Sequence, residues 1–300
     1  MPTAGGALTI ANMLSPAACP YFDCKVMCKL GHMDSRQVRP RHRLKDSPLI
    51  LVLCQIRFAP VLTMEKFIPQ IQDELRRKGY PGYEQTSVHE IHIGENGPSF
   101  RESLRWVFSS QDRSKFLILT NSTVALEVVE YSTFEQFLLD LAPGIEALSA
   151  AVQPTFAHRL GLRYVDALPA IGDEVSKFFK EKVLSFRPEE LGVEALLSSQ
   201  QVIARTDVGQ LMIRMNQVEN APLLPADLQS PELSGIADTL SGVHAILDID
   251  SSDERQGQFD LAEFNERLWA IHDYASAAFW ESITEYAKSA WKIEELESAL

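Results

Sequence analysis

The sequence contains no apolar run long enough to cross a membrane. No stretch approaches the roughly 18 uncharged apolar residues that a membrane-spanning helix needs. It also has no glycine-rich phosphate loop, dinucleotide-binding fingerprint, serine nucleophile elbow or repeat of fixed period. We therefore expect a protein that is not integral to a membrane and lies outside the most readily recognised enzyme classes.

Positive charge is in short supply. The 28 lysine and arginine residues are outnumbered by 41 aspartate and glutamate residues, which gives a formal net charge of -13. This charge repels phosphate backbones and anionic lipids, so we expect neither nucleic acid nor a membrane as a partner. One alternative stays open, because residues 36–45 concentrate basic side chains that could bind nucleic acid.

Cysteine is equally rare, and nothing in its four positions demands an oxidising compartment. The N-terminus has no basic region before its apolar stretch, which Asn12 and Pro16 interrupt. We therefore expect a soluble, cytoplasmic protein.

The N-terminal segment holds four residues of the types that bind zinc, spaced five, four and four apart: Cys19, Cys24, Cys28 and His32. Structural zinc sites usually draw two close pairs of ligands from separate elements. We therefore expect no metal here, and no cofactor elsewhere, although the sequence does not decide the zinc question. Residues 1–46 are predicted to be disordered or a mis-assigned extension, with Met1 and Met33 as alternative starts.

From residue 47 the apolar pattern predicts an α+β fold. Residues 49–58 and 156–168 predict strands at the two ends of a block that runs strand, helix, four strands, helix, strand. Consecutive hairpin strands cannot all be parallel. We therefore expect a mostly antiparallel twisted sheet with packed helices over residues 47–168, in which the first and last strands of the block could be neighbours.

Residues 169–300 are predicted to form a second α+β part packed on the first. It contains a hairpin around residues 201–215, a strand over 243–249 and a long amphipathic helix from Leu261 to about Trp291. Residues 219–235 are rich in proline and serine and are expected to form a long exposed loop. Trp269 and Trp280, on the helix, could cover the sheet or seat a partner.

Five strings carry a family resemblance: PLILVLCQIRF, WVFSSQDRSKFLILTNSTVALEVVEYSTFEQFLLDL, RLGLRYVDAL, LDID and LWAIHDYASAAFWESIT. Over about residues 47 to 290, the chain resembles a sporadically distributed family of uncharacterised bacterial proteins. The resemblance implies a bacterial, intracellular protein and no particular catalytic residue or substrate. Members often carry asparagine where this chain has Asp166, which argues against a fixed catalytic role for that residue.

The strand RLGLRYVD offers a candidate ligand site. Arg159 and Arg163 share one strand face, with a glycine between them, and could clamp a phosphate or carboxylate. Tyr164 and Asp166 lie on the other face. The alternative is that the arginines form salt bridges on a half-exposed sheet face.

The strand HAILDID offers a second candidate. His244, Asp248 and Asp250 share one strand face and could converge on a divalent cation. The alternative is that the two aspartates are solvated residues at the end of the strand.

Other titratable groups are set aside. His272 and Asp273 lack the further ligands of a metal-dependent phosphohydrolase, and His272 is expected to be partly buried on the apolar stripe of its helix. His89 and His92 fall on opposite faces of a strand, and a thiolate at buried Cys54 is disfavoured.

These patterns favour an acidic protein-binding or ligand-binding interaction protein without catalytic residues, with another protein or a second copy as its partner. The alternative is a metal-dependent, phosphoester-directed enzyme or nucleotide binder. Its residues would come from Arg159, Arg163, Tyr164, Asp166, His244 and Asp248.

Overall fold

A computed structural model describes residues 41–94, 97–169, 174–184, 186, 191–193, 196–236 and 238–296. Residues His42–Glu294 form one contact unit, and the fold reported below is that of this unit. Strand β1 (Arg41–Leu44) pairs with β12 (Ile293–Leu296). It falls inside the N-terminal segment that was predicted to lie outside the folded part.

The remaining elements follow in chain order. They are β2 (Leu49–Phe58), a short 3-10 turn (Met64–Lys66), α1 (Ile68–Arg77), β3 (Gly82–Gly94), β4 (Gly97–Ser109), β5 (Lys115–Leu119), β6 (Thr123–Val128), α2 (Phe134–Ala151), β7 (Phe156–Leu168), α3 (Val175–Phe178), a 3-10 turn (Glu181–Val183), β8 (Leu197–Arg205), β9 (Gly209–Glu219), two 3-10 turns (Ala226–Leu228 and Pro231–Leu233), β10 (Val243–Asp253), β11 (Gly257–Gln258), α4 (Leu261–Ser282) and α5 (Glu285–Ala290).

Within the described residues, one large antiparallel sheet has the strand order β3-β4-β5-β6-β2-β7-β10-β9-β8, and β11 pairs with the end of β7. The predicted α+β class, with its block of strand, helix, four strands, helix and strand, is confirmed. Strands β2 and β7 pair along most of their length, so the expectation that they could be neighbours is also confirmed.

The chain repeats its element order across the middle of the sheet. The first half, residues 49–151, runs from β2 through α1 and a meander to α2. The second half, residues 156–282, runs from β7 through α3 and a meander to α4. Since β2 and β7 lie side by side at the centre, each meander extends outward from its own central strand.

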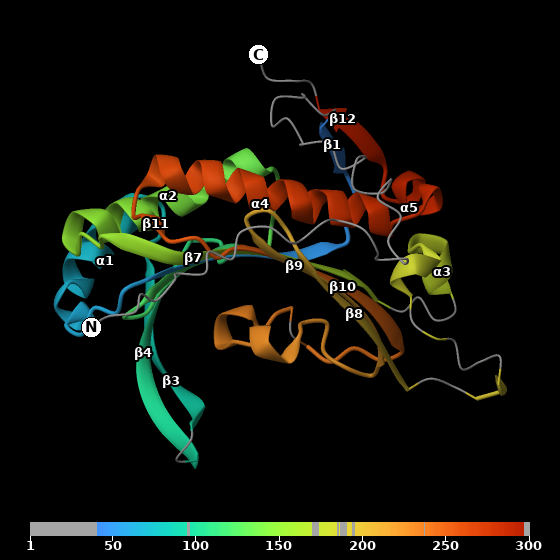
Figure 1. The fold of residues 1–300 in the computed structure, drawn as a ribbon, viewed down its shortest axis with the longest axis horizontal. Helices are drawn as coiled ribbons and strands as arrows, with labels where there is room; N and C mark the ends of the chain where they lie inside the picture. Colours follow the sequence, from blue (N-terminus) through green and yellow to red (C-terminus); the bar gives the residue numbers. More distant parts are fainter. Residues whose placement is uncertain are drawn as a thin grey trace, which may run out of the picture. The chain divides into compact units, whose positions relative to one another are not determined.

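One face of the sheet, called the helix face, carries α1, α2 and α4, and α2 and α4 lie above the strands in Figure 1. Alternate residues of β2 point into this layer, because strand side chains alternate between faces. They meet apolar residues of the helices in a single core that includes Val52, Ile56, Leu75, Phe137, Leu141, Phe264 and Leu268.

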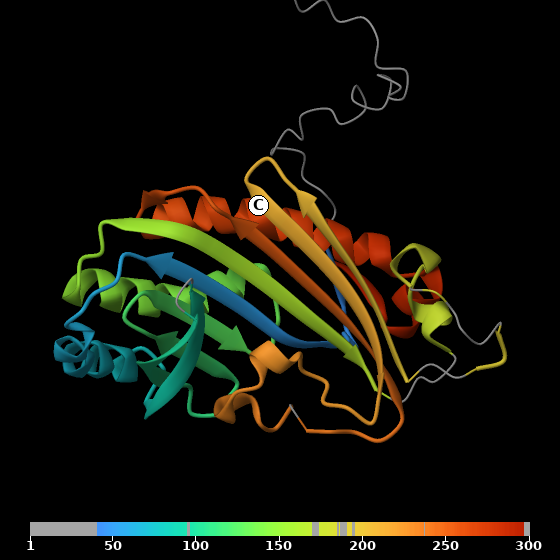
Figure 2. The ribbon, with the colours of Figure 1, turned by 60° about the horizontal axis from the view of Figure 1, so that its bottom comes forward.

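The opposite face, called the cover face, is partly covered by the connection between β9 and β10. This cover segment, residues 221–242 with residue 237 outside the described set, lies against the strands in Figure 2. Leu224, Leu228 and Leu233 are buried there against β2, β5 and β7. The segment is a long connection, as predicted, but the prediction that it is exposed is wrong for these three leucines. They follow no regular period, and their apolar side chains nevertheless pack against the sheet.

The predicted C-terminal helix is present, and it ends at Ser282 rather than near Trp291. Ile283 is extended and pairs with Phe179, which interrupts the helical hydrogen bonds. Thr284 then caps α5 by accepting a hydrogen bond from the backbone of Ala287. No helix in the described part of the chain is both long and apolar enough to span a bilayer.

Candidate functional site

Arg163 lies at the centre of an ion-pair network on the cover face. Its Nε and Nη2 donate to the two carboxylate oxygens of Asp248 at 2.7 and 2.8 Å, a bidentate pair between neighbouring strands β7 and β10. Asp227 of the cover segment accepts from Nη1 at 2.5 Å. Burial opposes the charge on Arg163, yet hydrogen bonds to both aspartates raise its pKa above the ordinary value.

Two further residues complete this network. Arg214 on β9 donates to Asp248 at 3.4 Å and to the side-chain oxygen of Gln201 on β8 at 2.9 Å. Asp250 pairs in register with Arg163, and burial raises its pKa while the charges of Arg159 and Arg163 oppose that change. The network therefore links β7, β10, β9 and β8 across the second half.

Asp248 is fully buried in the middle of β10, which continues to Asp253. The alternative interpretation of Asp248 and Asp250 as solvated residues at a strand end is therefore wrong. A buried carboxylate needs a charged or hydrogen-bonding partner, and Arg163 lies 85 residues away in sequence. The pattern of the strand alone does not reveal that partner.

Arg159 and Arg163 share the cover face, as predicted from strand alternation, and each binds its own carboxylate. Arg159 donates from Nε to Glu254 at 3.0 Å. Its guanidinium also folds over Gly161, where an added Cβ would lie only 2.6 Å from Arg159 Nη1. The salt-bridge alternative therefore describes both arginines better than a joint clamp on a ligand.

Tyr164 and Asp166 point into the helix face, on the opposite side of the sheet from Arg163. The Tyr164 hydroxyl lies 2.7 Å from Nδ1 of His272 on α4, whose ring stacks on Phe134 at 4.0 Å. Burial, together with the charge of Asp248, raises the pKa of Asp166 to about 8. His272 is half-buried among aromatic rings, as predicted.

His244 lies on the cover face near the start of β10 and is fully buried. Its Nε2 is 3.0 Å from the backbone oxygen of Leu240 in the cover segment. Four residues of strand separate it from Asp248, about 13 Å at the usual rise per residue. Of the four groups Arg163, Asp166, His244 and Asp248, Arg163 and Asp248 form a bidentate ion pair.

The cover segment adds a second pair of charges, this time to the first half of the sheet. Glu232 forms an ion pair with Arg105 of β4, and Glu127 of β6 lies 3.9 Å from the same guanidinium. No described residue hydrogen-bonds to Oε2 of buried Glu127. Burial, with the charge of Glu232, raises the pKa of Glu127 to about 8, while Arg105 opposes the change.

No group of three or more His, Cys, Asp and Glu side chains among the described residues is arranged to hold a metal ion. The zinc candidates Cys19, Cys24, Cys28 and His32 lie outside the described residues. The segment with His89 and His92 is a strand, as predicted.

Both candidate interface tryptophans are half-buried within the fold. The ring of Trp269 packs against Phe134 at 4.6 Å, and that of Trp280 lies 5.4 Å from Phe279 and 5.9 Å from His42. Their role in seating a partner stays a prediction.

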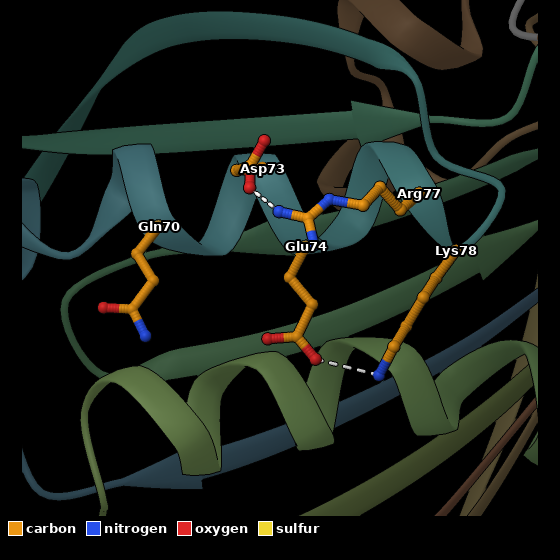
Figure 3. A pocket seen from close by; sticks show the side chains of 5 residues that line it. All are labelled: Gln70, Asp73, Glu74, Arg77 and Lys78. Atoms are coloured by element: carbon orange, nitrogen blue, oxygen red, sulfur yellow. Dashed lines mark ion pairs between the residues drawn. The ribbon is translucent and has the colours of Figure 1, made fainter.

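A surface hollow beside α1 does not bring distant residues together. Its lining comes from one helix and the residue that follows it, as Figure 3 shows: Gln70, Asp73, Glu74, Arg77 and Lys78. Lys78 pairs with Glu74 at 2.8 Å and Arg77 pairs with Asp73. These are neighbours on a solvated helix face, and spacing of this kind is typical of surface ion pairs.

The feature that the sequence did not point to is the free edge of β8. This strand pairs with β9 on one side, and no described strand pairs with its other side. Leu197, Val202 and Ile203 are 67%, 48% and 61% exposed, so apolar side chains are uncovered on both faces. The alternating pattern around residues 201–215 predicted the hairpin but not its place at the end of the sheet.

The backbone of β8 offers hydrogen-bonding groups along this edge that no described strand pairs with. Thr206 donates its backbone N–H to the oxygen of Gly209 and closes the hairpin. Because bonded and non-bonded pairs alternate in an antiparallel ladder, the N–H and C=O groups of Ser199, Gln201 and Ile203 face away from β9.

Comparisons with known proteins assign no family to the chain. No family model matches the chain, and no curated protein matches it either. Among solved structures, a phage SAM lyase in its apo state matches 39% of this chain and 80% of its own, with 12% identity and a TM-score of 0.20. Since that score is far below 0.5, the likeness says nothing about fold or function.

Proposed function

We propose that this protein is a bacterial, cytoplasmic interaction protein without catalytic activity, which docks an extended segment of a polypeptide chain along the free edge of β8. The exposed apolar edge of β8 carries the proposal. Proteins recognise extended segments by adding them as a strand to a sheet edge, where backbone bonds supply affinity and alternate side chains supply specificity.

Exposed edges are usually protected against such pairing. Natural sheets place lysine, proline, inward-pointing charges or bulges on their edge strands. The nine residues of β8, LSSQQVIAR, contain no proline, no lysine and no acidic residue, and their one charge is Arg205 at the end. An edge without these protections is an aggregation hazard for a monomer, so its presence favours a strand that is covered by a partner.

The enzyme alternative, with the strands RLGLRYVD and HAILDID around a phosphoester or nucleotide, stays a prediction. The contacts of Arg163 do not favour it. Nε, Nη1 and Nη2 of Arg163 already donate to Asp248 and Asp227. Arg163 is largely buried, so a phosphate could bind it only by displacing one of these carboxylates. The displaced carboxylate would then lose its charged partner, which is unfavourable.

Site-specific photo-crosslinking tests the proposal. A photoreactive amino acid replaces Val202 in the full chain, expressed in its native host, and a matched chain carries it at Leu139, an apolar α2 residue that is 66% exposed. We expect one discrete adduct from position 202 that maps by mass spectrometry to an extended segment of one polypeptide. Equal labelling from both positions would show that the adduct reflects exposure alone.

A backbone control sharpens the experiment. Gln201→Pro removes an outward-facing N–H that β9 does not use, whereas Gln201→Ala removes the same side chain and keeps the N–H. We expect the position 202 adduct to be lost in the proline variant and kept in the alanine variant. A chain that gives no discrete adduct from position 202 would overturn the proposed function.

A further inference from the structure

Resting on this proposed function, we infer that the segment which docks on β8 is β8 of a second copy of the chain. Two copies would pair antiparallel about a two-fold axis and join their sheets into one. An interface of this kind is isologous, so each copy supplies the same strand as both donor and acceptor.

The internal repeat shows what β8 lacks. Counting outward from the central strands, β6, β5 and β4 follow β2, and β10, β9 and β8 follow β7. Strand β4 therefore occupies the position of β8, and β3 pairs with its outer edge along the length of the strand. No described strand of the second half fills the matching place beside β8, so this half is one strand short of the first.

The backbone of β8 is suited to pair with itself. Centred on Gln201, an antiparallel copy brings outward-facing groups opposite outward-facing groups all along the strand, because Ser199 then faces Ile203 of the second copy. Leu197 and Arg205 face each other at the two ends. Arg205 is the one charged residue of the strand, and it lies opposite Leu197, so this pairing places no two charged residues opposite each other.

Charge selects β8 over the other edge of the sheet. At a net charge of -13, two copies repel each other over most of their surface. Strand β3 carries the exposed acidic residue Glu84, and an antiparallel copy of β3 would bring this charge from each copy to the contact. Strand β8 has no acidic residue, so it is the edge at which two copies meet with the least repulsion.

The size of the contact sets the expected affinity. Nine residues on each side are fewer than the roughly 20–30 residues per side of a standard stable interface. We therefore expect a reversible dimer with a dissociation constant in the micromolar range, whose population depends on concentration.

Sedimentation velocity of the purified full chain, over a range from submicromolar to near-millimolar, tests the inference. We expect the wild-type mass to rise from monomer to dimer, Gln201→Pro to stay monomeric, and Gln201→Ala to dimerise like the wild type. The alanine control also loses the bond that Arg214 donates to Gln201, so a difference between the two variants isolates the backbone N–H. Ile203→Lys should weaken the dimer at least about tenfold, because it adds a charge to an apolar edge.

Thermal unfolding of each variant at the lowest concentration checks that the monomer is intact. If Gln201→Pro unfolds, Ile203→Lys decides, because its substitution is exposed and leaves the β8 backbone unchanged. A wild-type chain that stays monomeric throughout, or a folded proline variant that dimerises like the alanine variant, overturns the inference. If the wild type is monomeric and position 202 still crosslinks to a different protein, the second copy is excluded and the proposed docking function stands.

Discussion

The two halves of the sheet share an order of elements but differ in the pairing and burial of the third strand from the centre, which is β4 in the first half and β8 in the second. In the first half, β4 is paired on both sides and its Trp106 and Phe108 are buried on the helix face. In the second half, β8 is paired on one side and its Val202, on the same face, is 48% exposed. The same position in the repeat is thus a core strand in one half and a surface strand in the other.

The helices account for part of this difference. Helix α1 has ten residues, and its Ile71 and Leu75 join the core above the first meander. Its counterpart α3 has four residues and packs on α5, where the ring of Phe178 lies 5.5 Å from that of Trp291. A helix of one turn cannot extend over β8, so the helix face of that strand is left open.

The connection between the two strands next to the centre is, by contrast, longer in the second half than in the first. In the first half, β5 and β6 are joined by a tight turn at residues 120–122. The corresponding connection in the second half is the cover segment, which buries three leucines and sends Asp227 and Glu232 to arginines of the sheet. The second half therefore uses its extra residues to cover the centre of the sheet, while no strand in the described part of the chain pairs with its outer edge.

Alanine substitutions on the helix face of β4 and of β8 test most directly whether the two strands differ in burial. Phe108→Ala removes a buried ring on the helix face and should lower the free energy of unfolding by about 3–5 kcal/mol. Val202→Ala on β8 should change it by less than about 1 kcal/mol, because the residue is 48% exposed. Urea unfolding at low protein concentration measures both. Similar losses would mean that the two strands are equally covered.

A second pair of variants separates a contact within the second half from a contact with the cover segment. Asp248→Asn leaves Arg163 buried without its bidentate partner and should cost about 3 kcal/mol. Asp227→Asn removes a carboxylate that is 62% exposed from the same guanidinium and should cost less than about 1 kcal/mol. Urea unfolding measures both losses. If Asp227→Asn lowered the free energy of unfolding more than Asp248→Asn, the contact with the cover segment would contribute more to stability than the contact within the sheet.

The sequence predicted the features that depend on neighbours in the chain. The alternation of RLGLRYVD placed Arg163 and Tyr164 on opposite faces, and the apolar period of residues 261–282 placed a helix there. Both follow from local geometry, since strand and helix periods are fixed by the backbone. The order of elements from β2 to β7 was predictable for the same reason.

Apart from the pairing of β2 with β7, the features that depend on distant residues were not predictable. Arg163 meets Asp227 across 64 residues, and nothing in the pattern of either segment indicates the pairing. Burial of the cover segment depends on three leucines in a stretch without period. The free edge of β8 is a property of strand order, which a single sequence does not show.

The remaining expected effect depends on pH and concerns a buried carboxyl in each half. Burial raises the pKa of Glu127, and likewise that of Asp166, to about 8. A carboxyl with a raised pKa holds its proton in the folded state at a pH where the unfolded chain has released it. Stability is therefore lost as the pH rises from about 4 to about 8, on the order of 1 kcal/mol per unit for each fully coupled group.

Replacing one of these carboxyls by an amide tests this in the half to which it belongs. Glu127→Gln cannot ionise, so its gain in stability over the wild type should be near zero at about pH 4 and grow until about pH 8. Asp166→Asn on the helix face should behave with the same sign, because its pKa has the same dominant cause. Urea unfolding across this pH range measures both differences. A gain for Glu127→Gln that does not change with pH would mean that the cover segment leaves this carboxyl hydrated, whereas a matching pair of slopes would show that both halves bury an uncharged acid at neutral pH.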